Sequence, residues 1–323
     1  MSKIRIGVLR GGPSDEYSVS LKTGGSVLRN LPDHYVGQDI LITKDGVWHV
    51  GGVPHTPEQA LKKIDVIFNA LHGAYGEDGK VQKILDDYGV PYTGSKSFSS
   101  LLSMNKFLAK DIFKKNDIKT PYHVVIQIEE GDRIEDVALK LFKEFPMPAI
   151  VKPLSSGSSV GVSVASDFQS LKDSISLALK YNDQILVEEF IRGREATCGI
   201  IEKFRGQEDY SLIPIELKNK NLSHFKTEEK MEGDYEFQIP GNFSDDEKKK
   251  ISEIAIGAHK VLDLRHYSTS DFIISPKRGI YLLEVNSLPG IHEHSLLPKS
   301  LEASGATMQE FLDHVISLAI GEK

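Results

Sequence analysis

The stretch TSDFIISPKRGIYLLEVNSLPG, residues 269–290, is typical of two strands joined by a tight turn. Successive side chains of a strand point to opposite faces, so Glu284 and Asn286 point the same way. If PKRG (276–279) forms a four-residue turn, Asp271 lies directly opposite Glu284, where cross-strand side chains approach to about 5 Å. The hairpin therefore predicts three oxygen donors together at its open end.

Two carboxylates and one amide suit Mg²⁺ in phosphoryl transfer, because they leave coordination positions for water and phosphate oxygens. A solvent-exposed strand end, on which acidic residues only protect a sheet edge, is the alternative. The sequence HEH (292–294) does not predict a further metal site, since no third nitrogen ligand is placed with it.

The loop KPLSSGSSVGV (152–162) follows a strand that ends in Lys152. Its serines and glycines leave backbone N–H groups able to surround phosphate oxygens, while the lysine supplies positive charge. The loop is not a Walker loop, because the pattern G-x-x-x-x-G-K-[ST] is missing. A serine-rich hairpin turn is the alternative interpretation.

The segment VEEFIRGRE (187–195) places Glu188, Glu189 and Glu195 around the aromatic Phe190. A purine site needs an apolar surface, backbone groups for the base edge and an acid for the ribose hydroxyls, and this segment contains all of them. An exposed acidic turn explains the same residues equally well.

The first 95 residues alternate short apolar runs with amphipathic segments, which favours a parallel sheet in a Rossmann-like unit. Two glycine-rich turns, RGGPSDEYS (10–18) and LHGAYGEDG (71–79), follow strands of this unit, where ligands of open α/β sheets bind. Glu16 and His72 in these turns could bind a small zwitterion. A structural, hydrogen-bonded histidine is the alternative for His72.

Soft domain boundaries are expected near Ser95 and Val187. The polar stretch HFKTEEKMEGDYEF (224–237) lacks regular periodicity, so we expect a mobile loop that closes over the site. The expected units are residues 1–95, 96–187 and 188–323.

Composition excludes several classes of protein. The chain has 323 residues and a net charge of −7, which argues against a broad nucleic-acid interface. Cys198 is the single cysteine, so an intrachain disulfide is impossible and a reducing compartment fits. The N-terminal MSKIRIGVLRGG is too short and polar for a secretory signal, and no run approaches the roughly 20 apolar residues of a membrane span. We expect a cytoplasmic protein with no nucleic-acid partner and no membrane insertion.

Taken in order, the motifs resemble those of the D-alanine–D-alanine ligase family of the ATP-grasp fold, from the first strand to the last helix. They are GGPSDEYSVSLKTG, LHGAYGEDGKVQ, PYTGS, SMNK, VKPLSSGSSVGVS, EEFIRGRE, SDFII, LLEVNSLPG and HSLLPK. The resemblance implies an α/β protein with an N-terminal Rossmann-like domain plus central and C-terminal α+β domains that clasp ATP. It also implies ATP-dependent joining of two D-alanines through an acyl phosphate, for peptidoglycan precursors, by an enzyme that forms a homodimer.

The resemblance assigns roles by matching position. The implied ligands of Mg²⁺, as two ions with Mn²⁺ as a possible substitute, are Asp271, Glu284 and Asn286. The implied ATP contacts are Lys106 and Lys152 on the phosphates, Glu188, Phe190 and Glu195 on adenine and ribose, and Lys230 on the mobile loop. The implied amino-acid site has Glu16 on the first ammonium with His72 nearby, Ser158 at the reacting groups, Gly290 on the oxyanion, and Ser295 with Leu296 on the second carboxylate.

Three positions depart from the family pattern. Thr269 stands where an arginine is expected to brace the transferring phosphate, Met231 where a tyrosine is expected, and Ser156 where an acidic residue is expected. Arg265 could replace the missing arginine only if the strand bends. These departures leave open a ligase with another acceptor, such as a 2-hydroxy acid or a different amino acid, and a nucleotide-binding homologue that has lost ligation.

Overall fold

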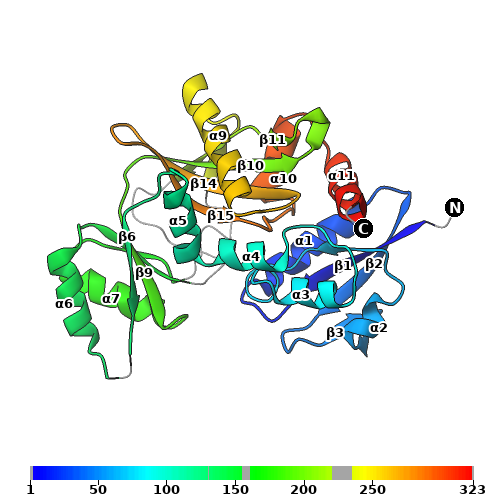
Figure 1. The fold of residues 1–323 in the computed structure, drawn as a ribbon, viewed down its shortest axis with the longest axis horizontal. Coiled ribbons are helices and arrows are strands. Elements are labelled where there is room, and N and C mark those ends of the chain that lie inside the picture. The colour runs from blue at the N-terminus through cyan, green and yellow to red at the C-terminus, as the bar shows by residue number, and fades with distance from the viewer. Residues whose placement is uncertain (1–2, 130, 155–160, 220–234, 322–323) are drawn as a thin grey trace.

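The computed structural model describes the chain except for residues 1–2, 130, 155–160, 220–234 and 322–323. It contains a five-stranded, a four-stranded and a six-stranded sheet, which lie in three lobes along the long axis of the molecule (Figure 1). The expected mixed α/β architecture is confirmed. None of the helices in the described ranges is long and apolar enough to cross a membrane.

The N-terminal sheet has the strand order β4-β3-β2-β1-β5, and β1 pairs in parallel with both β2 and β5. Gly11 ends β1 with φ +87°, and a Cβ there would lie 2.2 Å from the Ile42 carbonyl oxygen, so the turn that carries Glu16 requires glycine. The strands are β1 (Ile4–Gly11), β2 (Tyr35–Ile42), β3 (Trp48–Val50), β4 (Val53–His55) and β5 (Val66–Asn69). The helices are α1 (Tyr17–Asn30), α2 (Pro57–Leu61), α3 (Lys80–Asp87) and α4 (Ser97–Met104).

The four-stranded sheet, order β6-β9-β7-β8, forms the lobe at the left of Figure 1 with two helices packed against it. Its apolar residues form a cluster of their own around Val151, Ile175 and Val187. The elements are β6 (His123–Gln127), α6 (Ile134–Glu144), β7 (Ala149–Pro153), β8 (Ser163–Ala165), α7 (Phe168–Ala178) and β9 (Gln184–Glu189). Helix α5 (Lys106–Lys115) precedes it.

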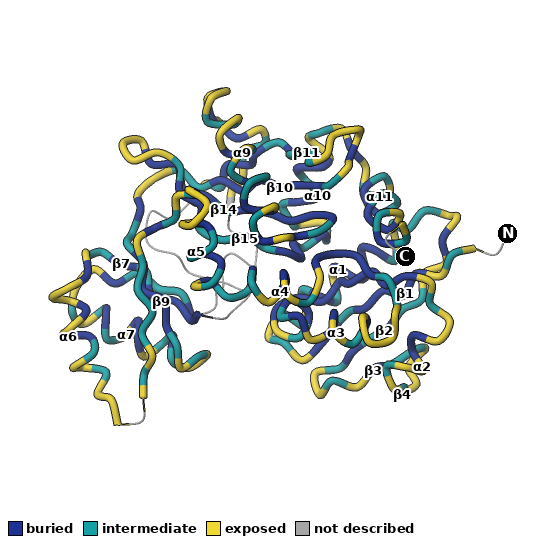
Figure 2. Tube along the Cα trace, viewed as in Figure 1, coloured by how far each residue is buried: buried dark blue, intermediate teal, exposed yellow. Residues whose placement is uncertain are grey.

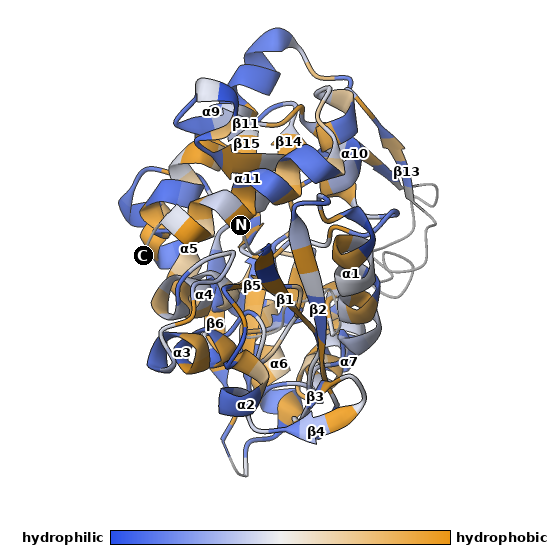
Figure 3. Ribbon diagram, turned by 90° about the vertical axis from the view of Figure 1, so that its right-hand side faces the viewer, coloured by the Kyte–Doolittle hydropathy of each residue, from blue (hydrophilic) through white to orange (hydrophobic). Residues whose placement is uncertain are grey.

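The six-stranded sheet follows the path β13-β12-β10-β14-β15, with β11 paired to β10. Helix α9 covers one face; it begins with a capping box between Ser244 and Glu247, and much of its outer surface is hydrophilic (Figure 3). The strands are β10 (Arg194–Glu202), β11 (Asp209–Ser211), β12 (Ile215–Asn219), β13 (Tyr235–Gln238), β14 (Tyr267–Ser275) and β15 (Gly279–Asn286). The helices are the 3-10 turn Phe204–Gly206, α9 (Asp245–Val261), α10 (Leu296–Ala303) and α11 (Met308–Gly321).

Buried residues lie in all three lobes (Figure 2), and the clusters that they form link the lobes unequally. One cluster contains Val8 and Phe68 of the N-terminal sheet together with Ile201 of β10 and Tyr267 of β14. A second contains Phe113 of α5 together with Phe272 of β14. The N-terminal and six-stranded sheets therefore share apolar core, whereas the four-stranded sheet has a separate one. The boundaries near Ser95 and Val187 stay a prediction.

Candidate active site

Lys106, the first residue of α5, lies where the predicted groups meet. Its Nζ is 3.9 Å from Glu284 Oε2, and the lysine is buried. Burial lowers the pKa of Lys106, while Glu284, Glu188 and Glu77 act in the opposite direction. Lys106 in turn opposes the raised pKa of Glu16. Acidic groups from all three lobes therefore interact around one ammonium group.

The predicted metal ligands lie together on the β14–β15 hairpin. Asp271 is the cross-strand partner of Glu284, so that part of the prediction is confirmed. The hydroxyl of Thr197 donates to Asp271 Oδ1 at 2.5 Å, and the N–H of Leu288 donates to Asn286 Oδ1 at 3.0 Å. These hydrogen bonds hold oxygen donors in fixed orientations.

The donor set fits a magnesium ion that also binds phosphate. Two carboxylates and one amide oxygen on neighbouring strands are hard ligands, too few to enclose a cation alone. Within the described part of the chain, no cluster of three or more His, Cys, Asp or Glu residues could hold a metal ion. The three protein oxygens of Asp271, Glu284 and Asn286 leave coordination positions for phosphate oxygens, as expected for phosphoryl transfer.

The predicted four-residue turn is wrong. Ser275 pairs with Gly279, so that three residues form the loop. Gly279 has φ +81°, the left-handed conformation that completes a three-residue hairpin loop. A β-bulge at Leu283 then restores the pairing of Asp271 with Glu284.

A buried cluster of two lysines and one glutamate lies beside the hairpin. Lys110 Nζ is 2.7 Å from one carboxylate oxygen of Glu188, and Lys152 Nζ is 2.7 Å from the other. Burial alone would raise the pKa of Glu188, but the two ammonium groups outweigh it and lower the pKa to about 2. Burial also lowers the pKa of Lys110 to about 8. With Lys106 nearby, the cluster carries excess positive charge, which suits phosphate.

The predicted purine segment divides between two roles. Both carboxylate oxygens of Glu188 form ion pairs with lysines, and Glu189 forms an ion pair with Arg278 at 2.8 Å. The N–H of Phe190 donates to the Pro148 carbonyl at 3.2 Å. Glu195 is the cross-strand partner of Ile273, which belongs to an apolar cluster that the sequence did not identify. This cluster consists of Ile191, Ile273, Tyr281 and Leu283.

The amino-acid side of the site is built from the two glycine-rich turns. His72 Nε2 lies 2.8 Å from the Thr23 hydroxyl, and His72 Nδ1 lies 3.4 Å from Glu77 Oε1, so both ring nitrogens face protein groups. Burial raises the pKa of Glu16 to about 7, and the nearby Glu77 carboxylate adds to the rise. A Cβ on Gly73 would lie 3.0 Å from Glu16 Oε1, so glycine leaves room for this carboxylate.

The loop after β15 carries the remaining predicted residues. A Cβ on Gly290 would lie 2.7 Å from the hydroxyl of Ser295, which places these two residues in contact distance. Ser295 occupies the N-cap position of α10 without a capping hydrogen bond from its side chain, and Leu296 is the first residue of that helix. Burial lowers the pKa of His292 in this loop to about 4, and His72 contributes in the same direction, so the loop faces the turn of the N-terminal sheet.

Several predictions lie outside the described residues: those for Ser158 and Lys230 and the departures at Ser156 and Met231. The mobile-loop prediction falls largely on the same undescribed stretch. The roles assigned to the other site residues stay predictions.

The missing arginine is not replaced from upstream. Thr269 pairs with Asn286 and is buried. Arg265 precedes β14 and points to the N-terminal unit, where it donates to the carbonyl oxygens of Gly94 at 2.9 Å and Tyr92 at 3.0 Å. Its side chain is thereby fixed away from Thr269.

Sequence reasoning missed Lys110, Glu77 and Thr23. Lys110 follows Lys106 by four residues, so both fall on one face of α5, and this spacing was an available signal. Glu77 lies in the quoted turn LHGAYGEDG, but nothing in that turn alone shows that its side chain reaches His72. No sequence pattern indicates that Thr23 contacts His72.

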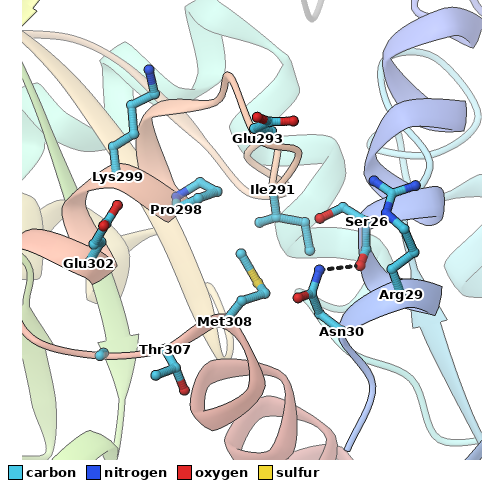
Figure 4. A pocket seen from close by; sticks show the side chains of 11 residues that line it. Ser26, Arg29, Asn30, Ile291, Glu293, Pro298, Lys299, Glu302, Thr307 and Met308 are labelled. Atoms are coloured by element: carbon cyan, nitrogen blue, oxygen red, sulfur yellow. Dashed lines mark hydrogen bonds between the residues drawn. The ribbon is translucent and has the colours of Figure 1, made fainter.

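A cavity of about 500 Å³ lies between α1 and α10, next to the loop that follows β15 (Figure 4). Its lining includes two basic side chains, Arg29 and Lys299, and two acidic ones, Glu293 and Glu302. The Asn30 amide donates to the Ser26 carbonyl at 2.8 Å within α1. These balanced charges select no particular ligand, so the residues gathered around Lys106 form the candidate active site.

Comparisons with known proteins agree with this geometry. Residues 52–95 match the family model described as D-ala D-ala ligase N-terminus, and residues 112–317 match D-ala D-ala ligase C-terminus. The chain is 36% identical to a D-alanine–D-alanine ligase of Geobacter sulfurreducens over 97% of this chain and 93% of that protein. It is 32% identical to D-alanine–D-alanine ligase B of Clostridium perfringens over 99% of each chain.

Solved structures show the same likeness. The D-alanine–D-alanine ligase of Coxiella burnetii has a TM-score of 0.84 at 26% identity and covers 100% of this chain and 95% of its own. The VanG D-Ala:D-Ser ligase of Enterococcus faecalis has a TM-score of 0.83 at 26% identity, with 98% and 100% covered. The chain belongs to the D-alanine–D-alanine ligase family of the ATP-grasp fold.

Proposed function

We propose that this protein is an ATP-dependent ligase that joins D-alanine to D-alanine for peptidoglycan precursors. The observation that carries the proposal is that Lys106 interacts with both halves of the site. Its Nζ lies 3.9 Å from Glu284 of the β14–β15 hairpin, and its charge acts on Glu16 in the first glycine-rich turn. A nucleotide phosphate bound there would lie between a metal site and a zwitterion site. That arrangement is what phosphorylation of an amino-acid carboxylate requires.

The proposed reaction has two displacements. The carboxylate of the first D-alanine attacks the terminal phosphorus of ATP, which breaks the bond to ADP and forms an acyl phosphate. The amine of the second D-alanine then attacks the acyl carbon, loses a proton and expels inorganic phosphate, which forms the peptide bond. Each step transfers one group, so no oxidant or reductant is needed.

Different residues of this chain would bind the phosphates, the metal and the amino-acid substrate. Lys106 and Lys152 would position the phosphates, with Glu188 holding Lys152 in place at 2.7 Å. Asp271, Glu284 and Asn286 would hold Mg²⁺, in two ions or with Mn²⁺ as a substitute, and this metal supplies charge neutralisation on the phosphate oxygens. Glu16 would bind the ammonium of the first substrate, and the Gly290 N–H would stabilise the oxyanion.

A second candidate is a ligase with another acceptor. Thr269 changes the charge next to the proposed site of chemistry, and one structural neighbour is a D-Ala:D-Ser ligase. D-serine, a different D-amino acid or a 2-hydroxy acid could then be the second substrate. A nucleotide-binding homologue with weakened ligation is the remaining alternative.

The test is phosphate release from Mg-ATP with D-alanine, D-serine and D-lactate offered singly and in pairs, with mass spectrometry of the products. D-Alanyl-D-alanine as the main product supports the proposal, and a mixed product supports the second candidate. Glu284→Gln is the control for metal-dependent turnover. ATP binding without any ligated product would exclude both ligase readings.

We also propose a homodimer that works in the cytoplasm, where ATP is available and where a single cysteine, Cys198, stays reduced. Light scattering after gel filtration measures the mass directly. A monomeric mass at micromolar concentration would contradict the dimer.

A further inference from the structure

The β14–β15 hairpin has an irregular register next to the proposed metal ligands. Ser275 pairs with Gly279, and the pairing proceeds regularly to Phe272 and Leu282. A regular ladder would next place Leu283 opposite Asp271. The observed partner is Glu284, so that Leu283 is an extra residue in β15.

This bulge reverses the alternation of side chains along β15. Leu282 and Val285 belong to the same core cluster although they are three residues apart, which a regular strand does not allow. Leu283 instead joins the cluster of Tyr281 on the other face. The residues after the bulge are thereby rephased, and Glu284 points to the face that carries Asp271.

Lys110 binds the bulge directly. Its Nζ donates to the Leu283 carbonyl at 2.9 Å and to the Thr120 hydroxyl at 2.8 Å, and it lies 2.7 Å from Glu188. An ammonium group has three donors, and these contacts use all of them. The side chain is only 1% exposed, so this geometry is fixed by packing.

We propose that Lys110 is a positioning residue that holds the Leu283 bulge and thereby aims Glu284 at the metal. The inference rests on the proposed function, because it concerns the magnesium site of that reaction. The contacts of the Lys110 ammonium are with Leu283, Thr120 and Glu188, none of which is a proposed metal ligand. Lys110 connects the end of β9, through Glu188, to the backbone that precedes Glu284.

The physical reason is the competition between two registers. A one-residue slip would turn Glu284 to the other face of the sheet, and Val285 would leave the core in exchange. The Lys110 contact favours the bulged register, because a charge-assisted hydrogen bond to the Leu283 carbonyl is lost when the bulge straightens. Without Lys110, the strand end would fluctuate more and Glu284 would be less well oriented.

The test uses Lys110→Met, which keeps an unbranched side chain, one atom shorter, and removes its charge. The affinity for ADP is measured by calorimetry with Mg²⁺ and with EDTA, and the ratio of the two affinities isolates the metal contribution. Mutation of residues that orient metal ligands typically costs about 10–100-fold in metal affinity, so we expect the ratio to fall by about tenfold or more. Hydrogen exchange of the ligand-free protein should also become faster in residues 279–286.

Two controls separate the bulge contact from other effects. Lys152→Met removes the other ammonium group that pairs with Glu188, also at 2.7 Å, and within the described residues Lys152 forms no ion pair with β15. It should weaken ADP binding with and without metal, but leave the ratio within about twofold. Lys115→Met, on the exposed face of α5, should change neither quantity.

If Lys110→Met does not fold, the isosteric Thr120→Val removes one partner of the ammonium and should lower the ratio two- to threefold, by an order-of-magnitude estimate. An unchanged ratio and unchanged exchange in residues 279–286 would overturn the proposal, as would equal falls in ratio for Lys110→Met and Lys152→Met. Failure of D-alanine ligation in the wild type would count against the proposed function alone, because these measurements need no turnover.

Discussion

The nucleotide side and the amino-acid side of the candidate site hold their carboxylates in opposite ways. On the nucleotide side, Glu188 has an ammonium group at 2.7 Å from each oxygen, and its pKa falls to about 2. On the amino-acid side, Glu16 lies near Glu77, and burial together with that neighbour raises the pKa of Glu16 to about 7. Glu188 is charged throughout the neutral range, whereas Glu16 changes charge near neutral pH.

This difference separates structural work from substrate recognition. Both oxygens of Glu188 are paired within the protein, and its two lysines offer positive charge to phosphate. Glu16 is costly to ionise until a cation arrives, and the ammonium of an amino acid would supply that cation. Mutations on the two sides should therefore act on different quantities.

The largest expected effect is the loss of stability in Glu188→Gln. Two buried lysines would lose their counter-ion, and removing one partner of a buried ion pair typically costs about 3–5 kcal/mol in the free energy of unfolding. Urea denaturation at neutral pH measures the change. Asp111→Asn, which removes an exposed pair on α5, is the control and should stay within about 0.5 kcal/mol.

The same variant has a pH signature. The pKa of Glu188 is lower in the folded protein than its ordinary value of 4.5, so its stabilisation is present above pH 4.5 and is lost as the pH falls toward 2. Glu188→Gln should lack this part of the acid dependence. Equal acid dependence in both proteins would show that the cluster does not stabilise the fold through charge.

The second expected effect is on rate. Thr269→Arg should raise the rate of ligation by about 10²-fold, because it restores a cationic donor for the phosphoryl oxygens. ADP affinity should change little, since the Glu188 cluster is untouched. Quenched-flow measurement of D-alanyl-D-alanine formation tests this.

Arg265→Ala is the matched control for that variant. Arg265 is bonded to the carbonyl oxygens of Tyr92 and Gly94, so its removal should leave the rate of ligation unchanged. A collapse of the rate would mean that Arg265 reaches the reacting groups after all. A wild-type rate near the typical value of about 10 s⁻¹, insensitive to Thr269→Arg, would show that the missing arginine does not limit this enzyme.

Local rules predicted the parallel sheet of the N-terminal unit and which candidate site residues share a face, whereas the fold class was predicted from the resemblance to the family. Strand alternation placed Glu284 and Asn286 on one face, and glycine-rich turns after parallel strands placed Glu16 and His72 together. The family motifs supplied the order of the lobes. These features depend on residues close in sequence, or on the general geometry of sheets.

The remaining features depend on contacts between distant segments. The pairing of Asp271 with Glu284 was predicted from a wrong turn length, and it holds because the Leu283 bulge compensates. That bulge is bound by Lys110, which is far away in sequence. No local pattern indicates such a contact, so register at this hairpin could not be derived from the sequence.

The third expected effect is a pH dependence confined to the amino-acid side. As the pH falls below 7, Glu16 gains a proton and loses the charge that would bind an ammonium group, so kcat/KM for D-alanine should fall about tenfold per pH unit. ADP affinity should stay nearly constant from pH 6 to 7.5, by the same estimate, because Glu188 remains ionised. If kcat/KM for D-alanine and the affinity for ADP changed with pH in the same way, the separation of the two sides would be contradicted.

The smallest expected effect tests why Glu16 is perturbed. Glu77→Gln keeps an oxygen that can accept the Gly73 N–H, now at 3.1 Å, but removes the like charge near Glu16. The midpoint of the kcat/KM profile should therefore move from about 7 toward lower pH, yet stay above 4.5, because burial is the larger cause of the raised pKa. Asp15→Asn is the graded control: Asp15 raises the pKa of Glu16 less than Glu77 does, so its removal should move the midpoint in the same direction by less. A midpoint that rises in Glu77→Gln, or moves further in Asp15→Asn, would show that charge repulsion between Glu16 and Glu77 does not set the titration of the amino-acid site.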